Sequence, residues 1–383
     1  MSESELGMLK FLKSTLAPLF RLFSKDLVVF IETHRGSGSN VHALYSALAD
    51  DPGTRFDCRL VRRNARGLRA TLRRELLLAQ AKWIVQDHGG RRRYPGQKVL
   101  ELWHGIPLKT MDLMDVNDPA SHAPLRLARS LPDVVISSSP IYETLLSACR
   151  SIPARRYRRF GFPRLRWLET DRRTARSHWG RLMERDVADH EKVILWMPTH
   201  RRIKSNGNGQ QHSAIPAILD NYLTEALDRS LEANDAWLVI KPHPNDEELA
   251  KERIRKCGTR VRLLTSDAFG EAIEDLYCLL PGTDALITDY SSIYFDYLLL
   301  DKPIAFVLDD LEQYRKERGF LLEPVTDWMP GHHIRALEEL DAFLQATRSN
   351  DDPHTKQRAT LRTTFYPEGI QNTATLIRDH ILK

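Results

Sequence analysis

The sequence predicts an α/β protein with two domains, each built on a parallel β-sheet. The chain has 383 residues, a length that favours two or three domains. Short apolar runs alternate along it with stretches of helical periodicity, and this rhythm indicates βαβ units and parallel sheets. The predicted strands are residues 27–31, 83–85, 99–103 and 134–136 in the first half, then 193–197, 237–240, 261–264, 285–287 and 304–308 in the second.

The boundary between the domains is expected near residue 165, because residues 150–190 are rich in arginine and lack a strand signal after about residue 160. The N-terminal Rossmann-like domain is predicted to span residues 26–165, and the C-terminal one residues 166–350. Residues 351–383 are expected to form C-terminal helices, the last of which can pack back on the first domain. Two such domains facing a central cleft would suit a nucleotide-linked substrate, since ligands bind beyond the carboxyl ends of the strands.

Residues 1–25 are predicted to form an amphipathic helix. A basic amphipathic helix can lie on an anionic membrane or pack on its own domain, and the sequence leaves both possibilities open. The segment lacks the apolar region and cleavage site of a secretory signal, and no run of about 18 apolar residues predicts a transmembrane helix. The apolar residues at helical spacing are Leu9, Leu12, Leu16, Leu19, Phe20 and Phe23.

Composition limits the class of partner. Hydrophobic residues make up 42% of the chain and charged residues 28%, which allows a substantial core. The net charge is +5, and arginine is dense at residues 62–74 and 150–185. Such a surface can serve nucleic acid, anionic lipid or a phosphorylated substrate, but no interleaved aromatics or known module support nucleic acid. The cysteines, at positions 58, 149, 257 and 278, lack metal-ligand spacing and are expected to be reduced thiols of a cytosolic protein.

The most informative stretch is 284–308. An apolar run stops at Thr288-Asp289-Tyr290-Ser291-Ser292, a helical stretch follows to residue 300, and a second apolar run covers 304–308. The N–H groups and dipole of a helix N-terminus favour anions, and Ser291 and Ser292 add hydroxyl donors. The turn is therefore predicted to hold phosphate; serines that only cap a buried helix are the alternative.

Polar residues also follow four other predicted strands. In chain order they are His104, Gly105 and Lys109; Ser137, Ser138 and Ser139; Thr199, His200 and Arg201; and Lys241 and His243. Arg201 and Lys241 can bind phosphate, and an imidazole can act as a general base or, when protonated, stabilise phosphate charge. His104 and His243, each beside a rigid Gly or Pro turn, are the stronger functional candidates. No Ser-His-Asp elbow, HExxH or convincing DxD pattern is present, so no metal site is predicted.

Several of these segments resemble the CDP-glycerol glycerophosphotransferases of teichoic acid synthesis. They are ELWHGIPLK (101–109), WMPTHR (196–201), KPHP (241–244) and ITDYSSIYFDYLLLDKPIAF (287–306). The resemblance extends to the Gly/Ser/Asn turn at 36–40, to GFPR (161–164) and to EQYRKERGF (312–320), and so covers about residues 27–375.

The resemblance implies a GT-B fold and transfer of glycerol phosphate, or ribitol phosphate, from a CDP-alditol to a hydroxyl on a lipid-linked acceptor. It assigns His104 as the base, His243, Arg201, Ser291 and Ser292 to the donor phosphates, and Asp289 to ribose or glycerol hydroxyls. The remaining substrate-site candidates within the matching motifs are Gly105, Lys109, Thr199, His200, Lys241 and Thr288.

The partners implied are CDP-glycerol, an undecaprenyl-diphosphate-linked saccharide or polymer, and an anionic membrane surface, with no nucleic acid. The expected location is peripheral, at the cytoplasmic face of the plasma membrane. No cofactor is expected, and a role for Mg²⁺ is left open.

Three departures from the family pattern bear on the site. His200 stands where the family commonly has an aromatic residue, and the late Pro-Gly-Pro motif reads Pro330-Gly331-His332. The short chain fits a primase that adds one unit better than a polymerase. The alternatives are a GT-B glycosyltransferase that uses a sugar nucleotide, and a ribitol phosphotransferase.

Overall fold

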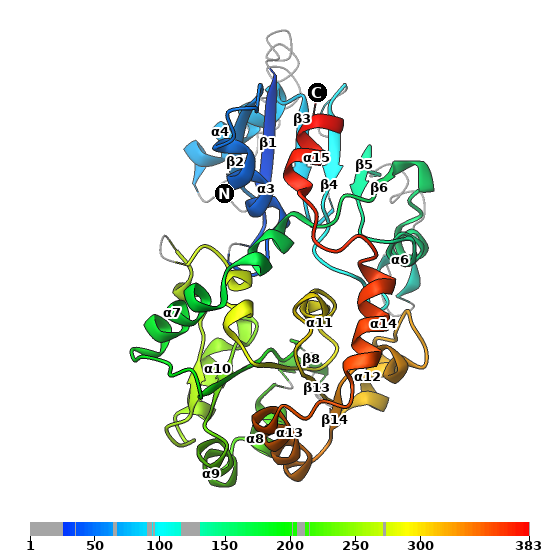
Figure 1. Cartoon of the computed structure of the whole chain (residues 1–383). Coiled ribbons are helices and arrows are strands. Elements are labelled where there is room, and N and C mark those ends of the chain that lie inside the picture. The colour runs from blue at the N-terminus through cyan, green and yellow to red at the C-terminus, as the bar shows by residue number, and fades with distance from the viewer. Residues whose placement is uncertain are drawn as a thin grey trace. The chain divides into compact units, whose positions relative to one another are not determined.

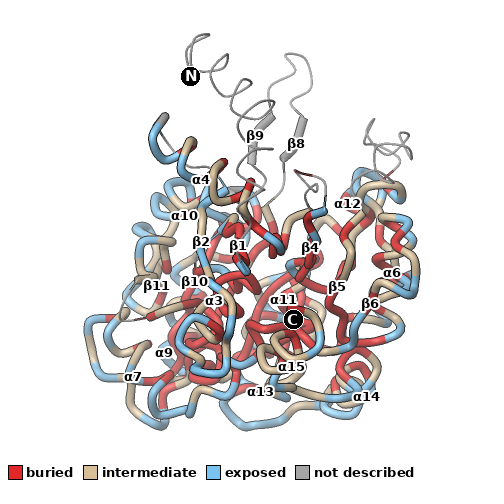
Figure 2. The backbone as a smooth tube through the Cα atoms, turned by 90° about the horizontal axis from the view of Figure 1, so that it is seen from above, coloured by how far each residue is buried: buried red, intermediate tan, exposed pale blue. Residues whose placement is uncertain are grey.

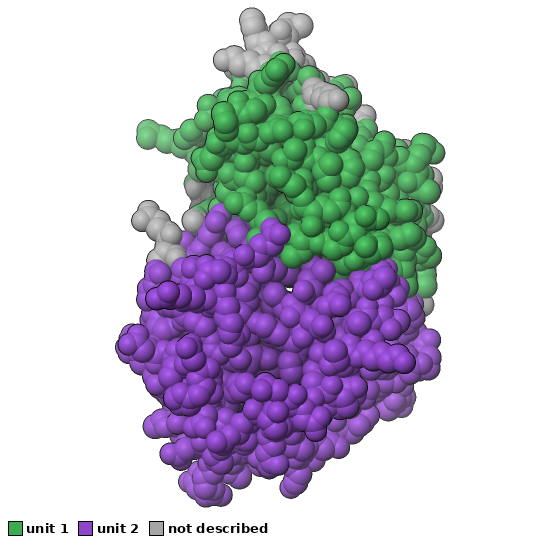
Figure 3. Space-filling model, in the orientation of Figure 1, with its two compact units in different colours: residues 1–104, 112–166, 366–383 green, residues 105–111, 167–365 purple. Residues whose placement is uncertain are grey.

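The computed structural model describes residues 26–34, 36–63, 67–89, 94, 96–115, 131–200, 202–204, 211–213, 215–270 and 273–382. The predicted N-terminal helix (1–25) and Arg201 lie outside these ranges. The chain forms two compact units (Figure 3): unit 1 takes in residues 1–104, 112–166 and 366–383, and unit 2 takes in residues 105–111 and 167–365. The chain therefore passes from one unit to the other directly after His104.

Unit 1 is built on a six-stranded parallel sheet with the order β2-β1-β3-β4-β5-β6 (Figure 1). The strands are β1 (Leu27–Glu32), β2 (Asp57–Arg62), β3 (Trp83–Gln86), β4 (Lys98–Glu101), β5 (Val134–Ile136) and β6 (Tyr157–Arg158). The helices are α3 (Asn40–Ala49), α4 (Leu68–Gln80), α6 (Pro140–Arg150) and α15 (Thr373–His380).

Helices cover both faces of the unit 1 sheet, because alternate residues of β1 point to opposite sides. Val28 and Phe30 pack with apolar residues of α3 and with Ile377 of α15. Val29 and Ile31 pack on the other face with Leu78 of α4. All six residues of β1 are buried, as its red tube shows in Figure 2. This two-sided burial is typical of a doubly wound α/β fold.

Unit 2 repeats this plan with the strand order β11-β10-β7-β12-β13-β14, again all parallel. The strands are β7 (Lys192–Trp196), β10 (Ala236–Ile240), β11 (Val261–Leu263), β12 (Ala285–Thr288), β13 (Ile304–Val307) and β14 (His332–Ile334), beside the antiparallel pair β8 (Arg202–Lys204) and β9 (Gln211–Ser213). The helices are α7 (Arg172–Met183), α8 (Ile215–Tyr222), α9 (Glu225–Ala233), α10 (Glu247–Ile254), α11 (Ile293–Tyr297), α12 (Leu311–Glu317), α13 (Leu337–Ser349) and α14 (Thr355–Phe365).

The core of unit 2 joins its central strands to four helices. Trp196 and Ile240 are fully buried and pack with apolar residues of α8, α9, α10 and α13. Trp196 pairs with Ile240 of β10 on one side and with Ile287 of β12 on the other. The carboxyl ends of three neighbouring strands therefore lie at the same level.

The predicted α/β class with two parallel-sheet domains is confirmed, and every predicted strand is present. Among the described strands, β2, β6 and β14 of the parallel sheets were not predicted, nor was the antiparallel pair β8 and β9. The segment 203–214 is polar and rich in glycine and asparagine, a composition that favours a loop, but residues 202–204 and 211–213 pair as strands; the others of that segment lie outside the described residues. Helix α14 belongs to unit 2 and helix α15 to unit 1. Within the described part of the chain, no helix is long and apolar enough to cross a membrane.

Candidate active site

His104 sits on a tight turn at the end of β4 whose backbone is held by two buried side chains. Trp103 has a φ of 54° and Gly105 a φ of 150°, both in the region that L side chains rarely adopt. The Asn40 side chain donates to the carbonyl of Trp103 at 2.8 Å. Arg164, only 3% exposed, donates to the carbonyl of His104 at 2.8 Å. These buried contacts hold the turn in its strained shape.

The His104 ring is fixed in one tautomer. Its Nδ1 lies 3.0 Å from the backbone carbonyl oxygen of Asp87, and since a carbonyl only accepts, Nδ1 carries the hydrogen. The Nε2 lone pair is then available to take a proton. The ring of His88 stacks on His104 at 4.5 Å and 15°, and the Asp87 carboxylate lies 2.7 Å from Nδ1 of His88.

The environment keeps the His104 imidazole neutral. Its pKa is lowered to about 4, first by the loss of hydration among surrounding protein atoms and then by the nearby His88. The residue nevertheless remains exposed to solvent. A neutral, accessible imidazole with a free Nε2 is suited to general-base chemistry at pH 7.

A third histidine, His34, lies beside His88 and His104 in unit 1. His34, His88 and His104 follow β1, β3 and β4, which are neighbours in the sheet. His34 contacts His88 edge-on at 5.2 Å, and burial lowers the pKa of His34 as well. We call His34, His88, His104 and Asp87 the histidine cluster.

Sequence reasoning missed the supports of the His104 turn: Asp87, His88, Asn40 and Glu101. The Trp103 N–H donates to Glu101 at 3.1 Å, and burial raises the pKa of Glu101 to about 7. Asp87 and His88 directly follow β3, whose residues 83–85 were predicted as a strand, so the strand-end rule that selected His104 would have found them. Asn40 shows no such signal, because its partner Trp103 is distant in the chain.

Gly105 and Lys109, predicted as substrate-site residues beside His104, are grouped with unit 2. Lys109 forms an isolated antiparallel bridge with Phe320. Leu321 N–H donates to the carbonyl of Leu108 at 2.8 Å, and Thr110 N–H donates to the carbonyl of Gly319 at 3.2 Å. The backbone of 108–110 is therefore tied to the segment after α12, the EQYRKERGF motif.

In unit 2 the structure brings the ends of β7 and β12 together through Thr199 and Asp289. Asp289, only 2% exposed, accepts from the Thr199 N–H at 2.9 and 3.1 Å and from its hydroxyl at 2.5 Å. The Thr288 hydroxyl donates to the carbonyl of Met197 at 2.8 Å. These contacts indicate that Asp289, Thr199 and Thr288 position the two turns. The Asp289 carboxylate, predicted to bind ribose or glycerol hydroxyls, is engaged within the protein.

The ends of β7 and β10 meet through two imidazoles. The rings of His200 and His243 stack at 4.9 Å and 29°. Nδ1 of His200 lies 2.6 Å from a carboxylate oxygen of Asp246, which is 1% exposed. Nδ1 of His243 accepts from the Asn245 N–H at 3.2 Å, so its Nε2 carries the hydrogen and can donate to a ligand.

Lys241 differs from its predicted role as a phosphate ligand. It is 3% exposed, and its ammonium donates to the carbonyl of Pro242 at 3.1 Å and to Glu247 and Ser266 at 3.4 Å. Burial lowers its pKa, and Glu247 opposes that shift. With its three hydrogens engaged, Lys241 braces the loop that carries His243.

Ser291 and Ser292 remain available for a ligand. The helix begins at Ile293, and Ser292 at its N-cap makes no side-chain capping bond. Neither hydroxyl has a hydrogen-bond partner among the described residues, and both side chains are half-exposed. The serine hydroxyls therefore do not cap the helix, which was the alternative to phosphate binding.

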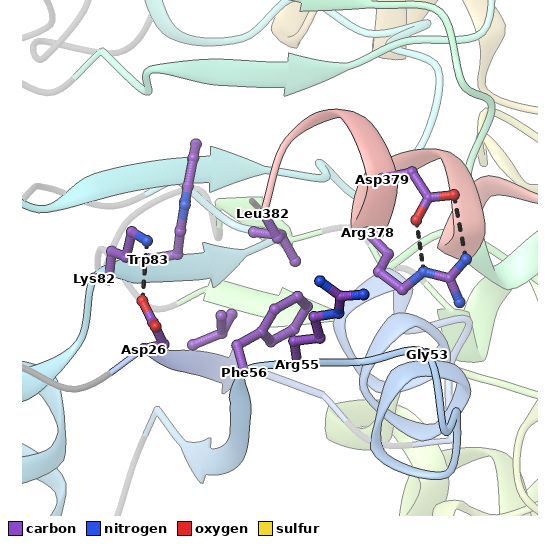
Figure 4. Close-up of a pocket in the computed structure, with 10 residues that line it drawn as sticks. Asp26, Gly53, Arg55, Phe56, Lys82, Trp83, Arg378, Asp379 and Leu382 are labelled. Carbon is purple, nitrogen blue, oxygen red and sulfur yellow. Dashed lines mark hydrogen bonds and ion pairs between the residues drawn. The ribbon is translucent and has the colours of Figure 1, made fainter.

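A separate cavity of about 610 Å³ lies elsewhere in unit 1 (Figure 4). It is lined by Asp26 and Trp83, at the amino-terminal ends of β1 and β3, and by Arg378 near the end of α15. None of the predicted site residues lines it. The histidine cluster follows the carboxyl ends of the same strands, so the cavity and the cluster lie at opposite ends of these strands.

Two parallel-sheet α/β units with their polar residues at strand ends define a GT-B-like protein. The sequence model of the protein family CDP-Glycerol:Poly(glycerophosphate) glycerophosphotransferase matches residues 14–382. The chain therefore belongs to this family of teichoic acid glycerol-phosphate and ribitol-phosphate transferases.

Individual relatives point to the same family. The chain is 26% identical over 302 residues to the teichoic acid glycerol-phosphate transferase of Staphylococcus aureus, covering 76% of this chain and 72% of that protein. It is 30% identical to the teichoic acid ribitol-phosphate primase of Bacillus spizizenii, over 44% of this chain and 43% of that one. The solved structure of the wall teichoic acid polymerase TagF matches its fold with a TM-score of 0.72 at 18% identity, covering 98% of this chain and 95% of that one.

Proposed function

We propose that the protein transfers glycerol phosphate from CDP-glycerol to a hydroxyl of a lipid-linked saccharide or poly(glycerol phosphate) acceptor. The observation that supports this most is the family match over residues 14–382. Since the acceptor is a lipid-linked molecule, the enzyme is expected to work as a peripheral protein at the cytoplasmic face of the membrane.

In the proposed reaction His104 is the general base. Its Nε2 removes the proton of the acceptor hydroxyl, and the oxygen attacks the phosphorus that bears glycerol. The bond from this phosphorus to the CMP oxygen breaks, and CMP leaves with the electron pair. The fixed Nδ1–H contact to Asp87 supports this role, and a positioned general base contributes roughly 10²–10⁴-fold to rate.

The donor phosphates are assigned to unit 2. The Nε2–H of His243 and the hydroxyls of Ser291 and Ser292 supply donors for the developing phosphoryl charge. Thr199, Thr288 and Asp289 hold the turns that carry them. Arg201, adjacent to His200, remains a proposed phosphate ligand from its motif, and it lies outside the described residues.

The nucleotide product tests this function. Attack at phosphorus releases CMP, whereas a glycosyltransferase attacks the anomeric carbon of a sugar nucleotide and releases a nucleoside diphosphate. The purified protein would be incubated with CDP-glycerol, CDP-ribitol and a panel of UDP- and GDP-sugars in the presence of a lipid-linked saccharide. CMP released from CDP-glycerol alone supports the proposal. CMP released from CDP-ribitol alone would show that the donor carries ribitol and not glycerol. A nucleoside diphosphate released from a sugar nucleotide would overturn the proposed reaction class.

A further inference from the structure

A cluster of two imidazoles and one carboxylate lies at the ends of β7 and β10. His200 follows β7, while His243 and Asp246 follow β10, and these strands are neighbours in the sheet. One nitrogen or oxygen of each side chain lies within 4.8 Å of the others. The sequence did not predict a metal site, because these residues come from two separate loops and match no spacing motif.

Asp246 is the residue of this cluster whose contacts are incomplete. Its side chain is 1% exposed, and only one of its carboxylate oxygens meets His200, at 2.6 Å. The other oxygen, Oδ1, is buried without a hydrogen-bond partner in the described part of the chain. Leaving a buried charged oxygen unpaired is costly, and a cation beside it would remove that cost.

The two imidazoles can complete a coordination shell. The lone pair of His243 Nδ1 accepts the Asn245 N–H in this structure, so a metal ion bound at this nitrogen takes the place of that hydrogen bond. His200 and His243 also reach solvent: the His200 side chain is 23% exposed and His243 is exposed. An ion can therefore enter from solvent. Metal–ligand bonds of about 2.0–2.2 Å require the three groups to close slightly.

We propose that His200, His243 and Asp246 bind one divalent transition-metal ion of the Zn²⁺, Co²⁺ or Mn²⁺ type. Two imidazoles with one carboxylate suit these ions, whereas Mg²⁺ prefers oxygen ligands. The ion takes the place of the proton that His200 Nδ1 shares with Asp246, and that proton shifts through solvent to Nε2 of the same ring, so that His200 binds as a neutral imidazole. Three protein ligands leave a coordination position open to water or, if the proposed function holds, to a donor phosphate oxygen.

Metal binding can be measured without any nucleotide. The full chain, stripped with a chelator and dialysed, would be titrated with Co²⁺ by absorption spectroscopy and with Zn²⁺ by calorimetry. We expect one equivalent to bind and to raise the melting temperature. His200→Phe keeps a ring that can stack on His243 but removes a ligand, and it should weaken binding by more than the roughly 10–100-fold typical of outer-shell changes. His243→Gln, at an exposed position, should do the same and serves if His200→Phe fails to fold.

The matched control is His190→Phe, which removes an exposed histidine outside the cluster and should leave affinity and stoichiometry unchanged. Absence of stoichiometric Co²⁺ and Zn²⁺ binding by the wild type would overturn the proposal. Equal affinity in wild type, His200→Phe and His243→Gln would overturn it as well. Because no nucleotide is present, a failure here is separate from a failure of CMP release.

Discussion

The Nδ1 nitrogen of His104 lies 3.0 Å from the backbone carbonyl oxygen of Asp87. This one contact determines which nitrogen of the ring can accept a proton. The carboxylate of the same aspartate meets His88 at 2.7 Å, so Asp87 orients two stacked imidazoles at once. A backbone carbonyl cannot be removed by substitution, which makes the tautomer of His104 a property of the fold itself.

Replacing His104 by alanine should abolish turnover. Loss of a general base lowers the rate by roughly 10²–10⁴-fold, while binding of CDP-glycerol should be nearly unchanged because its proposed ligands belong to unit 2. CMP release measures the first effect and calorimetry with CDP-glycerol the second. A variant that turns over at the wild-type rate would remove His104 from the base role.

The acid limb of the rate profile should lie well below the ordinary histidine pKa of 6.5, because the pKa of His104 is lowered to about 4. Below its pKa the imidazole is protonated and cannot accept a proton, so activity is lost as pH falls through that value. His88→Phe keeps a stacked ring and removes the second cause of the lowering. Its acid limb in kcat/KM should move to higher pH. Superimposable profiles of wild type and His88→Phe would contradict this coupling.

Arg164 should matter for both stability and catalysis. Its Nη1 donates to the carbonyls of His104 and Gly38 at 2.8 and 3.1 Å. Arg164→Met removes both of these hydrogen bonds, at about 1–3 kcal/mol for each group that stays unsatisfied. Urea unfolding should show this loss, and kcat should fall more than KM changes, since the His104 turn relaxes. The control is Arg159→Met, an exposed arginine that pairs with Glu143, where little loss of stability is expected. Equal losses in both variants would contradict the positioning role.

Substitutions at Ser292 and Thr199 should distinguish a residue that contacts the donor from one that stabilises the fold. A serine that caps a helix costs about 1 kcal/mol when changed to alanine, but Ser292 makes no capping bond. Ser292→Ala should therefore raise KM for the donor and leave the free energy of unfolding within about 0.5 kcal/mol. Thr199→Val breaks the hydroxyl contact to buried Asp289 and should destabilise by about 1–3 kcal/mol. The reverse order of stability losses would show that Ser292 is structural.

Glu101 should make stability depend on pH. Burial raises its pKa from 4.5 to about 7, so the folded protein binds more protons than the unfolded chain between these values. The free energy of unfolding should therefore fall as pH rises from about 4.5 to 7, by at most about 3 kcal/mol. Glu101→Gln removes this contribution, whereas Glu232→Gln, at an exposed helix position, retains it. Urea midpoints at pH 5 and 8 compare the variants; an unchanged pH dependence in Glu101→Gln would contradict the assignment.

The sequence predicted the central strands because buried parallel strands read as apolar runs. The three strands it missed in the two parallel sheets are edge strands. In β2 exposed and half-buried residues alternate, β6 has two residues, and β14 reads His-His-Ile. An edge strand needs few apolar residues, since one side of it faces no neighbouring strand.

The position of a candidate site residue was predictable where the residue follows a strand end, as for His104, His243 and Ser292. What could not be predicted is the partner that each side chain meets. Asn40 contacts Trp103, and His200 contacts Asp246, only because the fold brings distant segments together. Lys241 shows the converse, since its strand-end position predicted a phosphate ligand while Glu247 and Ser266 engage its ammonium.

The most direct test combines the donor with the proposed base. Wild-type protein and His104→Ala would be given CDP-glycerol and a synthetic lipid-linked saccharide, and the lipid product would be identified by mass spectrometry. We predict an acceptor extended by glycerol phosphate with stoichiometric CMP for the wild type, and no extension for His104→Ala although it still binds CDP-glycerol. An unmodified acceptor with the wild type, or an acceptor extended equally by both proteins, would contradict the proposed reaction and its base.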